Sequence, residues 1–134
     1  MVNFIPTILK GFSQVFLQEN IPLGILIIIG LAISSPVALI LAFIGNITAF
    51  ITSTVLGAEK TILDTGLLGF NGVLIGTMIS FYVKQMPMAI FLTILMSTVA
   101  TIIFFLFFKN NIPPFALPFT LMGWAILILL KLAK

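Results

Sequence analysis

Long apolar stretches separated by short polar breaks run along the whole chain. A helix needs about 20 mainly apolar residues to cross a bilayer. On this basis the pattern predicts a short first segment, of the re-entrant kind, followed by five membrane spans. The short segment is predicted at about 11–20, and the spans near 22–34, 36–56, 65–83, 87–108 and 114–131. The expected fold is therefore an all-α integral membrane domain that covers residues 1–134.

Prolines and polar residues explain where the spans stop. The residue before a proline avoids helical dihedral angles, so Pro22 and Pro36 are expected to begin new helices. The polar stretch 57–64, the turn 84–87 and the stretch 109–114 separate the later spans. These breaks predict short connections between neighbouring helices.

Two segments differ from ordinary spans. Segment 11–20 is too short and too polar to cross a bilayer, and Pro118 leaves a backbone carbonyl free early in the last span. In lipid, a free carbonyl is tolerated only where protein buries it or where it lines a cavity. Short or proline-interrupted segments therefore point to a transport site. Two alternatives stay open: segment 11–20 is an amphipathic helix at the membrane surface, and Pro118 only kinks its helix.

Four glycines and one carboxamide stand in an uncharged block of eleven residues in the middle of the chain. They are Gly66, Gly69, Asn71, Gly72 and Gly76. On a helix, glycines at this spacing form one smooth face, which lets another helix approach closely. The block predicts tight packing around a polar centre, where Asn71 either bonds to a neighbouring helix or meets a polar solute.

Composition agrees with a membrane protein. The chain is 61% hydrophobic and 7% charged, whereas a soluble domain has about a quarter charged residues. Cysteine and histidine are absent, which excludes disulfides, imidazole metal sites and Ser-His-Asp or Cys-His catalysis. We expect neither an enzyme nor a metal site or cofactor. The net charge of +3 comes from scattered lysines, so nucleic-acid binding is not expected.

The lysines show no bias between the two sides of the membrane. With five spans after a re-entrant segment, one side has Lys10, Lys60 and Lys109, and the other has Lys84, Lys131 and Lys134. Orientation in a membrane follows the excess of Lys and Arg on the cytoplasmic side. A balanced chain is therefore expected to insert in both orientations.

Aromatic side chains accompany the buried carboxamides and the interrupted helix. Phe12 and Phe16 flank Gln14, Phe70 precedes Asn71, and Phe115 and Phe119 bracket Pro118. A carboxamide has two donors and an acceptor, so one backbone carbonyl does not satisfy it. Facing rings and nearby oxygens would form a slot for a small, flat, neutral donor of hydrogen bonds. The pattern lacks the carboxylate ring or carbonyl filter of a cation channel.

In this order and spacing, three blocks resemble the urea transporter family. They are Gln14-Val15-Phe16 with Asn20 and Gly24, then Gly66 to Gly76 after Ser35-Pro36, then Pro114-Phe115-Ala116-Leu117-Pro118-Phe119. The resemblance covers about residues 11–131. It implies one half of an inverted-repeat fold, with five spans and a short pore helix, in a family whose members pass urea passively as channels and assemble as trimers.

The resemblance also implies site residues. Gln14 matches the pore-helix glutamine at a pore mouth, with Val15 and Leu17 beside it. Leu74 lies in the block that supplies apolar slot residues, with Phe70 beside it. The motif of the half-broken fifth span adds Phe115, Ala116 and Phe119. The four glycines of the central block, Asn71 and Pro118 are expected to serve helix packing.

Two departures from the family pattern keep alternatives open. Ala116 stands where the family has a threonine whose hydroxyl serves the middle of the pore, so another small amide or neutral solute is an alternative to urea. One half also does not enclose a pore. Either the chain is a piece of a longer protein, or two copies assemble antiparallel, as a dimer or as a trimer of such dimers. An accessory membrane subunit without a pore is the third alternative. The expected location is a bacterial cytoplasmic (inner) membrane.

Overall fold

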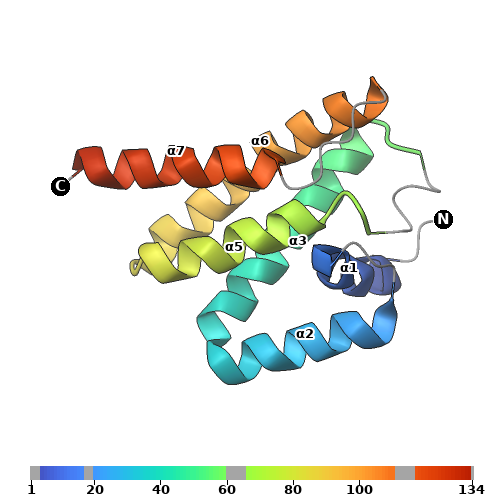
Figure 1. The fold of residues 1–134 in the computed structure, drawn as a ribbon, viewed down its shortest axis with the longest axis horizontal. Coiled ribbons are helices and arrows are strands. Elements are labelled where there is room, and N and C mark those ends of the chain that lie inside the picture. The colour runs from blue at the N-terminus through green and yellow to red at the C-terminus, as the bar shows by residue number, and fades with distance from the viewer. Residues whose placement is uncertain (1–3, 17–19, 60–65, 111–116, 134) are drawn as a thin grey trace.

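The computed structural model describes residues 4–16, 20–59, 66–110 and 117–133, and every regular element in these ranges is helical. The elements are α1 (Phe4–Ser13), the short 3-10 helix η1 (Gln14–Phe16), α2 (Ile21–Ser34), α3 (Pro36–Val55), α5 (Phe70–Tyr82), α6 (Met86–Lys109) and α7 (Leu117–Ala133). The all-α prediction therefore holds for the described part of the chain (Figure 1).

Caps and prolines start the helices. Proline occupies one of the first two positions of α2, α3 and α6, where its missing N–H costs no helical bond. Asn20 caps α2 by accepting a hydrogen bond of 3.1 Å from the Leu23 N–H. Ser35 caps α3 in the same way, at 3.2 Å from the Ala38 N–H. The sequence breaks at Pro22 and Pro36 thus have a local physical cause.

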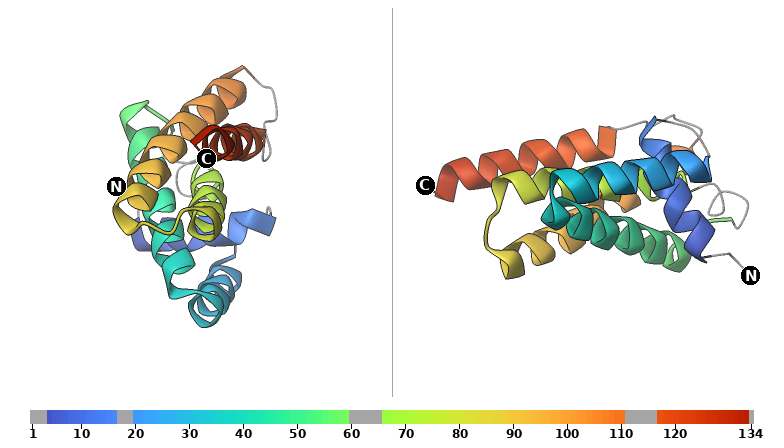
Figure 2. Two further views of the ribbon diagram at one scale, coloured as in Figure 1. Left: turned by 90° about the vertical axis from the view of Figure 1, so that its left-hand side faces the viewer. Right: turned by 90° about the horizontal axis from the view of Figure 1, so that it is seen from below.

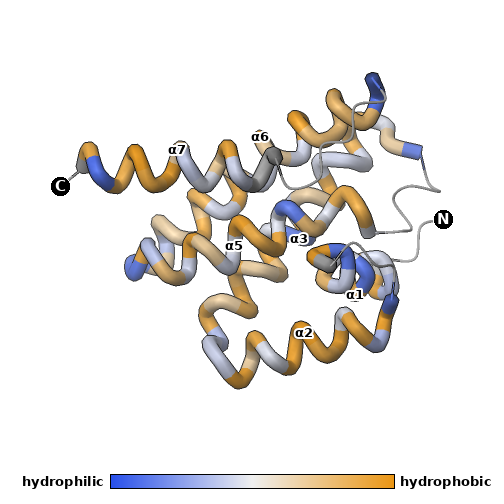
Figure 3. The backbone as a smooth tube through the Cα atoms, viewed as in Figure 1, coloured by the Kyte–Doolittle hydropathy of each residue, from blue (hydrophilic) through white to orange (hydrophobic). Residues whose placement is uncertain are grey.

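The helices from α2 to α7 alternate in direction. In Figure 1, α2, α5 and α7 run from right to left, whereas α3 and α6 run from left to right. Figure 2 (right) shows that most helices lie roughly along one common axis. Lys109 ends α6 at the same end of the molecule as α1, which carries Lys10, and Lys84 and Lys131 lie toward the opposite end. Figure 3 shows that most residues between these two ends are hydrophobic, with a few hydrophilic positions among them.

The centre of the fold is the contact between α3 and α5, against which α6 packs. A Cβ atom built on Gly72 would collide with the Gly45 carbonyl, and one built on Gly45 would collide with the Gly72 carbonyl. One turn further along α5, a Cβ on Gly76 would collide with the Leu41 carbonyl. The two backbones therefore touch, as small residues allow in membrane helices.

An apolar cluster joins the first half of α3, the second half of α5, the first two thirds of α6 and α7. Its buried members include Leu41, Ile75, Ile79, Met96 and Ile126. Thr93, Ser97 and Thr101 of α6 are buried as well, at a spacing of one helical turn, and the Ser97 hydroxyl lies next to Gly45 of α3. Thr101 donates its hydroxyl to the Ser97 carbonyl at 2.7 Å.

The helices differ from the predicted segments mainly at their starts. The first helix begins at Phe4, before the segment predicted at 11–20, and ends in the 3-10 turn at Gln14–Phe16. The span predicted near 65–83 corresponds to α5, which begins only at Phe70. Gly66 has a φ of +75°, in the left-handed region that favours glycine and ends helical geometry. Gly66 and Gly69 therefore precede the helix, and only Gly72 and Gly76 belong to it.

Two of the described helices, α3 and α6, have the length and composition to cross a membrane. α2 has 14 residues and α5 has 13. At 1.5 Å per residue, either is about 20 Å long, short of the roughly 30 Å of a bilayer core. Five spans around a re-entrant segment stay a prediction.

Candidate functional site

A groove with a volume of about 360 Å³ lies between η1, α2 and α5. Val15 of η1 and Leu74 of α5 both line it, so the fold brings together two candidate residues that are far apart in the sequence. The other lining residues are Ile27, Gly30, Leu31 and Ser34 of α2, and Val73 and Thr77 of α5. The groove is open along one side.

The groove wall is apolar apart from two hydroxyl groups. Thr77 donates its hydroxyl to the Val73 carbonyl at 2.8 Å, which leaves the lone pairs of its oxygen as acceptors. Ser34 lies at the last position of α2 and is exposed. None of the lining residues is ionisable. Such a surface offers weak hydrogen-bond acceptors and van der Waals contact but no fixed charge.

Gln14 adjoins the groove without being one of its lining residues. It begins η1, directly before Val15, and its side chain is buried with 6% exposed. The Ser13 side chain links the residues before η1 to the residue that precedes α2. The Ser13 hydroxyl donates to the Lys10 carbonyl at 2.8 Å and accepts from the Asn20 N–H at 3.1 Å. This link places the short helix against the start of α2.

Beside η1, α1 packs closely on α2. A Cβ atom on Gly24 would collide with the Leu9 carbonyl, so α1 and α2 are in backbone contact there. Phe12 is fully buried and packs edge-on against Phe43, with ring centroids 4.9 Å apart. Of the two phenylalanines that flank Gln14, Phe12 thus packs toward α3, and the side chain of Phe16 is not among those described.

Phe70 lies behind the groove. Its ring is 2% exposed and meets Phe104 edge-on, with centroids 5.8 Å apart. Val15 and Leu74 pack partly against this same aromatic cluster. Leu74, one helical turn after Phe70, reaches the groove, and in this single chain Phe70 supports the wall from inside.

The other predicted site residues have different placements. Asn71 is buried at 1% exposure in the first turn of α5. Pro118 and Phe119 stand in the first turn of α7, but their side chains are not described. Leu17, Phe115 and Ala116 lie outside the described residues. The roles predicted for these residues stay predictions.

Asn46 of α3 links α3 to α1 through its side chain, and it was not among the predicted site residues. Its side-chain amide donates to the Ile8 carbonyl of α1 at 2.8 Å, with 1% of the residue exposed. Its amide oxygen lies where a Cβ atom on Gly11 or Gly69 would stand. The glycines at these two positions therefore leave room for the Asn46 amide. An asparagine inside an apolar span is the sequence signal that could have identified it.

Gly30 and Thr77 of the groove were also missed. Thr77 follows Leu74 by three residues, and this spacing places both on one helix face. The pattern could thus have revealed Thr77. Gly30 has no atom within 4 Å of a Cβ built on it. Its place on the groove depends on how α2 packs and could not be read from the sequence.

Comparison with known proteins decides the family. A family model described as "Urea transporter" matches residues 5–134, nearly the whole chain. The chain belongs to the urea transporter family. The resemblance found in the sequence motifs is therefore confirmed. Because this family consists of integral membrane transport proteins, the chain is a membrane protein and not an enzyme.

Relatives in the urea transporter family are much longer than this chain. Urea transporter 1 of Ovis aries is 30% identical over 81 residues, which cover 60% of this chain and 21% of that protein. Urea transporter 1 of Rattus norvegicus is 29% identical over an aligned stretch of 136 positions, and the alignment covers 90% of this chain and 33% of that protein. The chain thus spans a third or less of the length of these relatives.

Proposed function

We propose that this chain forms one wall of a passive pore for urea, and that a second copy in the opposite orientation completes the pore. The observation that carries the proposal is the groove between η1, α2 and α5. It joins Val15 and Leu74, has no ionisable lining residue and is open on one side. An uncharged wall of this kind favours a small neutral solute over an ion.

The mechanism is desolvation of urea into a narrow slot. Transfer of an amide group out of water without new hydrogen bonds costs several kcal/mol. The amide oxygen of Gln14, which adjoins the groove, and the hydroxyl of Thr77 within it would replace part of the lost hydrogen bonds. The carbonyl freed by Pro118 would add a further acceptor. Leu74 and Val15 would contact the flat faces of the solute, with Phe70 and Phe104 supporting them. Leu17, Phe115 and Phe119 would complete the apolar wall.

We expect purified protein in liposomes to raise urea permeability above that of empty liposomes. Gln14→Leu should lower the urea flux by about tenfold, since one lost hydrogen bond of about 1.4 kcal/mol raises the barrier by that factor. Stopped-flow light scattering measures the flux. Gln85→Leu is the matched control, because Gln85 is exposed before α6 and its side chain makes no capping bond.

The same assay separates the alternatives. Wild-type protein that is folded but no more permeable than empty liposomes would favour an accessory subunit. Equal losses in Gln14→Leu and Gln85→Leu would remove Gln14 from the pore. Faster flux of acetamide than of urea would favour a small amide as the solute, in line with Ala116 where the family has a threonine.

The distribution of charge supports antiparallel assembly. Among the described residues, Lys10 and Lys109 lie at one end of the molecule and Lys84 and Lys131 toward the other. Equal numbers give no positive-inside preference. The proposal includes an antiparallel pair, three pairs to a complex, in a bacterial cytoplasmic membrane.

Dual orientation can be tested in cells, since the natural chain has no cysteine. We expect Gln85→Cys and Asn110→Cys, which lie at opposite ends of α6 and leave every lysine in place, each to react with a membrane-impermeant maleimide from both sides of the membrane. In intact cells each variant should be labelled to about half, and the rest after the cells are opened. Labelling of one variant only from outside and of the other only from inside would contradict dual insertion.

A further inference from the structure

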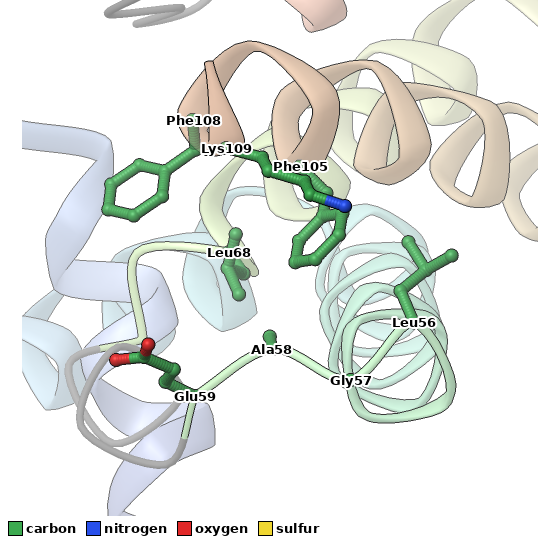
Figure 4. A pocket seen from close by; sticks show the side chains of 8 residues that line it. All are labelled: Leu56, Gly57, Ala58, Glu59, Leu68, Phe105, Phe108 and Lys109. Carbon is green, nitrogen blue, oxygen red and sulfur yellow. The ribbon is translucent and has the colours of Figure 1, made fainter. Parts of the chain in front are cut away.

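A second cavity, of about 420 Å³, lies away from the groove, where α3 and α6 end. The stretch 56–59 that leaves α3 forms one side of it, and Phe105, Phe108 and Lys109 of the last turns of α6 form another. Leu68, which precedes α5, lies between them (Figure 4). Its volume falls in the range of about 300–1,000 Å³ that is typical of small-molecule sites.

The cavity has one positive and one negative side chain. In Figure 4 the ammonium of Lys109 and the carboxylate of Glu59 stand apart, with Leu68 and Ala58 between them. Both residues are exposed, and no ion pair links either of them to another described residue. Phe105 and Phe108 supply aromatic surface beside Lys109. The cavity is thus dipolar at its rim and apolar in between.

Its position is at the edge of the apolar zone. α3 and α6 are the two described helices that are long and apolar enough to cross a membrane, and both end at this cavity. Leu106, between Phe105 and Phe108, is exposed on the outer face of α6. A molecule in the cavity would therefore meet water at the charged rim and lipid beside the last turns of α6.

We propose that this cavity binds the headgroup of a zwitterionic phospholipid with a primary ammonium, such as phosphatidylethanolamine. The phosphate would bind Lys109, the ammonium would bind Glu59, and the upper acyl chains would lie along Phe105 and Leu106. A lipid with a net negative headgroup fits less well, because Glu59 repels a second negative charge. This binding site does not depend on urea conduction.

Native mass spectrometry of the purified protein in detergent, titrated with phosphatidylethanolamine or phosphatidylglycerol, tests the proposal. We expect the wild type to retain one phosphatidylethanolamine with about fivefold preference over phosphatidylglycerol, the scale of one exposed charge pair. Lys109→Ala should lower phosphatidylethanolamine binding by about the same factor. Glu59→Gln should erase the preference, because it removes both the attraction for the ammonium and the repulsion of the anion.

Lys84→Ala is the matched control, since Lys84 is also exposed but lies at the other end of α6. It should bind both lipids as the wild type does. The proposal fails if Lys109→Ala and Glu59→Gln bind like the wild type. It also fails if Lys84→Ala loses as much lipid as Lys109→Ala, which would mean unspecific contact with surrounding lipid. All three side chains are exposed, so thermal unfolding should be unchanged and serves as the check on folding.

Discussion

Gly72→Ala will strongly destabilise the fold, although it adds only one methyl group. A Cβ atom at this position would collide with the Gly45 carbonyl of α3. The obstacle is backbone, so no side chain can rotate away, and α3 and α5 must separate. Overpacking of a core costs about 1–3 kcal/mol and occasionally more. We expect a loss of about 3 kcal/mol, seen as an earlier unfolding transition in detergent and a smaller monodisperse peak in size-exclusion chromatography.

Gly30→Ala is the matched control for this prediction. It makes the same change in the interior of a helix, but no atom lies within 4 Å of the added Cβ. Alanine is favoured over glycine in helices by about 1 kcal/mol, so Gly30→Ala should be neutral or slightly stabilising. Equal stability of Gly72→Ala and Gly30→Ala would show that α3 and α5 do not meet through Gly45 and Gly72.

Gly30→Phe will close the proposed urea path while the protein stays folded. Gly30 lines the groove opposite α5, and open space surrounds the position where the new side chain starts. A benzyl group at this position would project into the groove of about 360 Å³ and obstruct the space between α2 and α5. We expect urea flux in liposomes to fall to the level of empty liposomes, with the unfolding temperature within a few degrees of the wild type.

Ile29→Phe tests whether the effect belongs to the groove. Ile29 is the preceding residue of α2, is half exposed and is not among the lining residues. The same side chain there should leave the flux unchanged. Normal flux in folded Gly30→Phe would exclude the groove as part of the path, and loss of flux in both variants would point to an effect on α2 as a whole.

Much of the local structure could be predicted because its causes are local. Pro22 and Pro36 begin helices because a ring without an N–H fits the first turn, and Asn20 and Ser35 cap those helices through bonds to residues three positions on. The first residues of α1 and α5 were harder to predict from the sequence. Gly66 was expected in a helix, but it lies in a turn with a positive φ, where its backbone contacts Lys10 and Gly11 of α1. That contact joins segments more than 50 residues apart and has no local signal.

The candidate site was likewise predictable only where its residues belong to local motifs. Gln14, Val15 and Leu74 were identified from motifs, and the structure places Val15 and Leu74 on one groove. Gly30 and Asn46 were not identified as site residues. Gly30 matters because of the empty space beside it, and Asn46 because its amide reaches Ile8 of α1. Both properties arise from the packing of other helices.

The sequence by itself determined that the chain is an all-α membrane protein of the urea transporter family, because apolar content, helix breaks and motif order need no knowledge of contacts. Only the tertiary structure decided which glycine meets which carbonyl, that Phe70 packs behind Leu74, and that Glu59 and Lys109 share a cavity. The physical reason is that helix packing depends on close complementarity between surfaces distant in sequence, and a difference of one methyl group decides whether they fit.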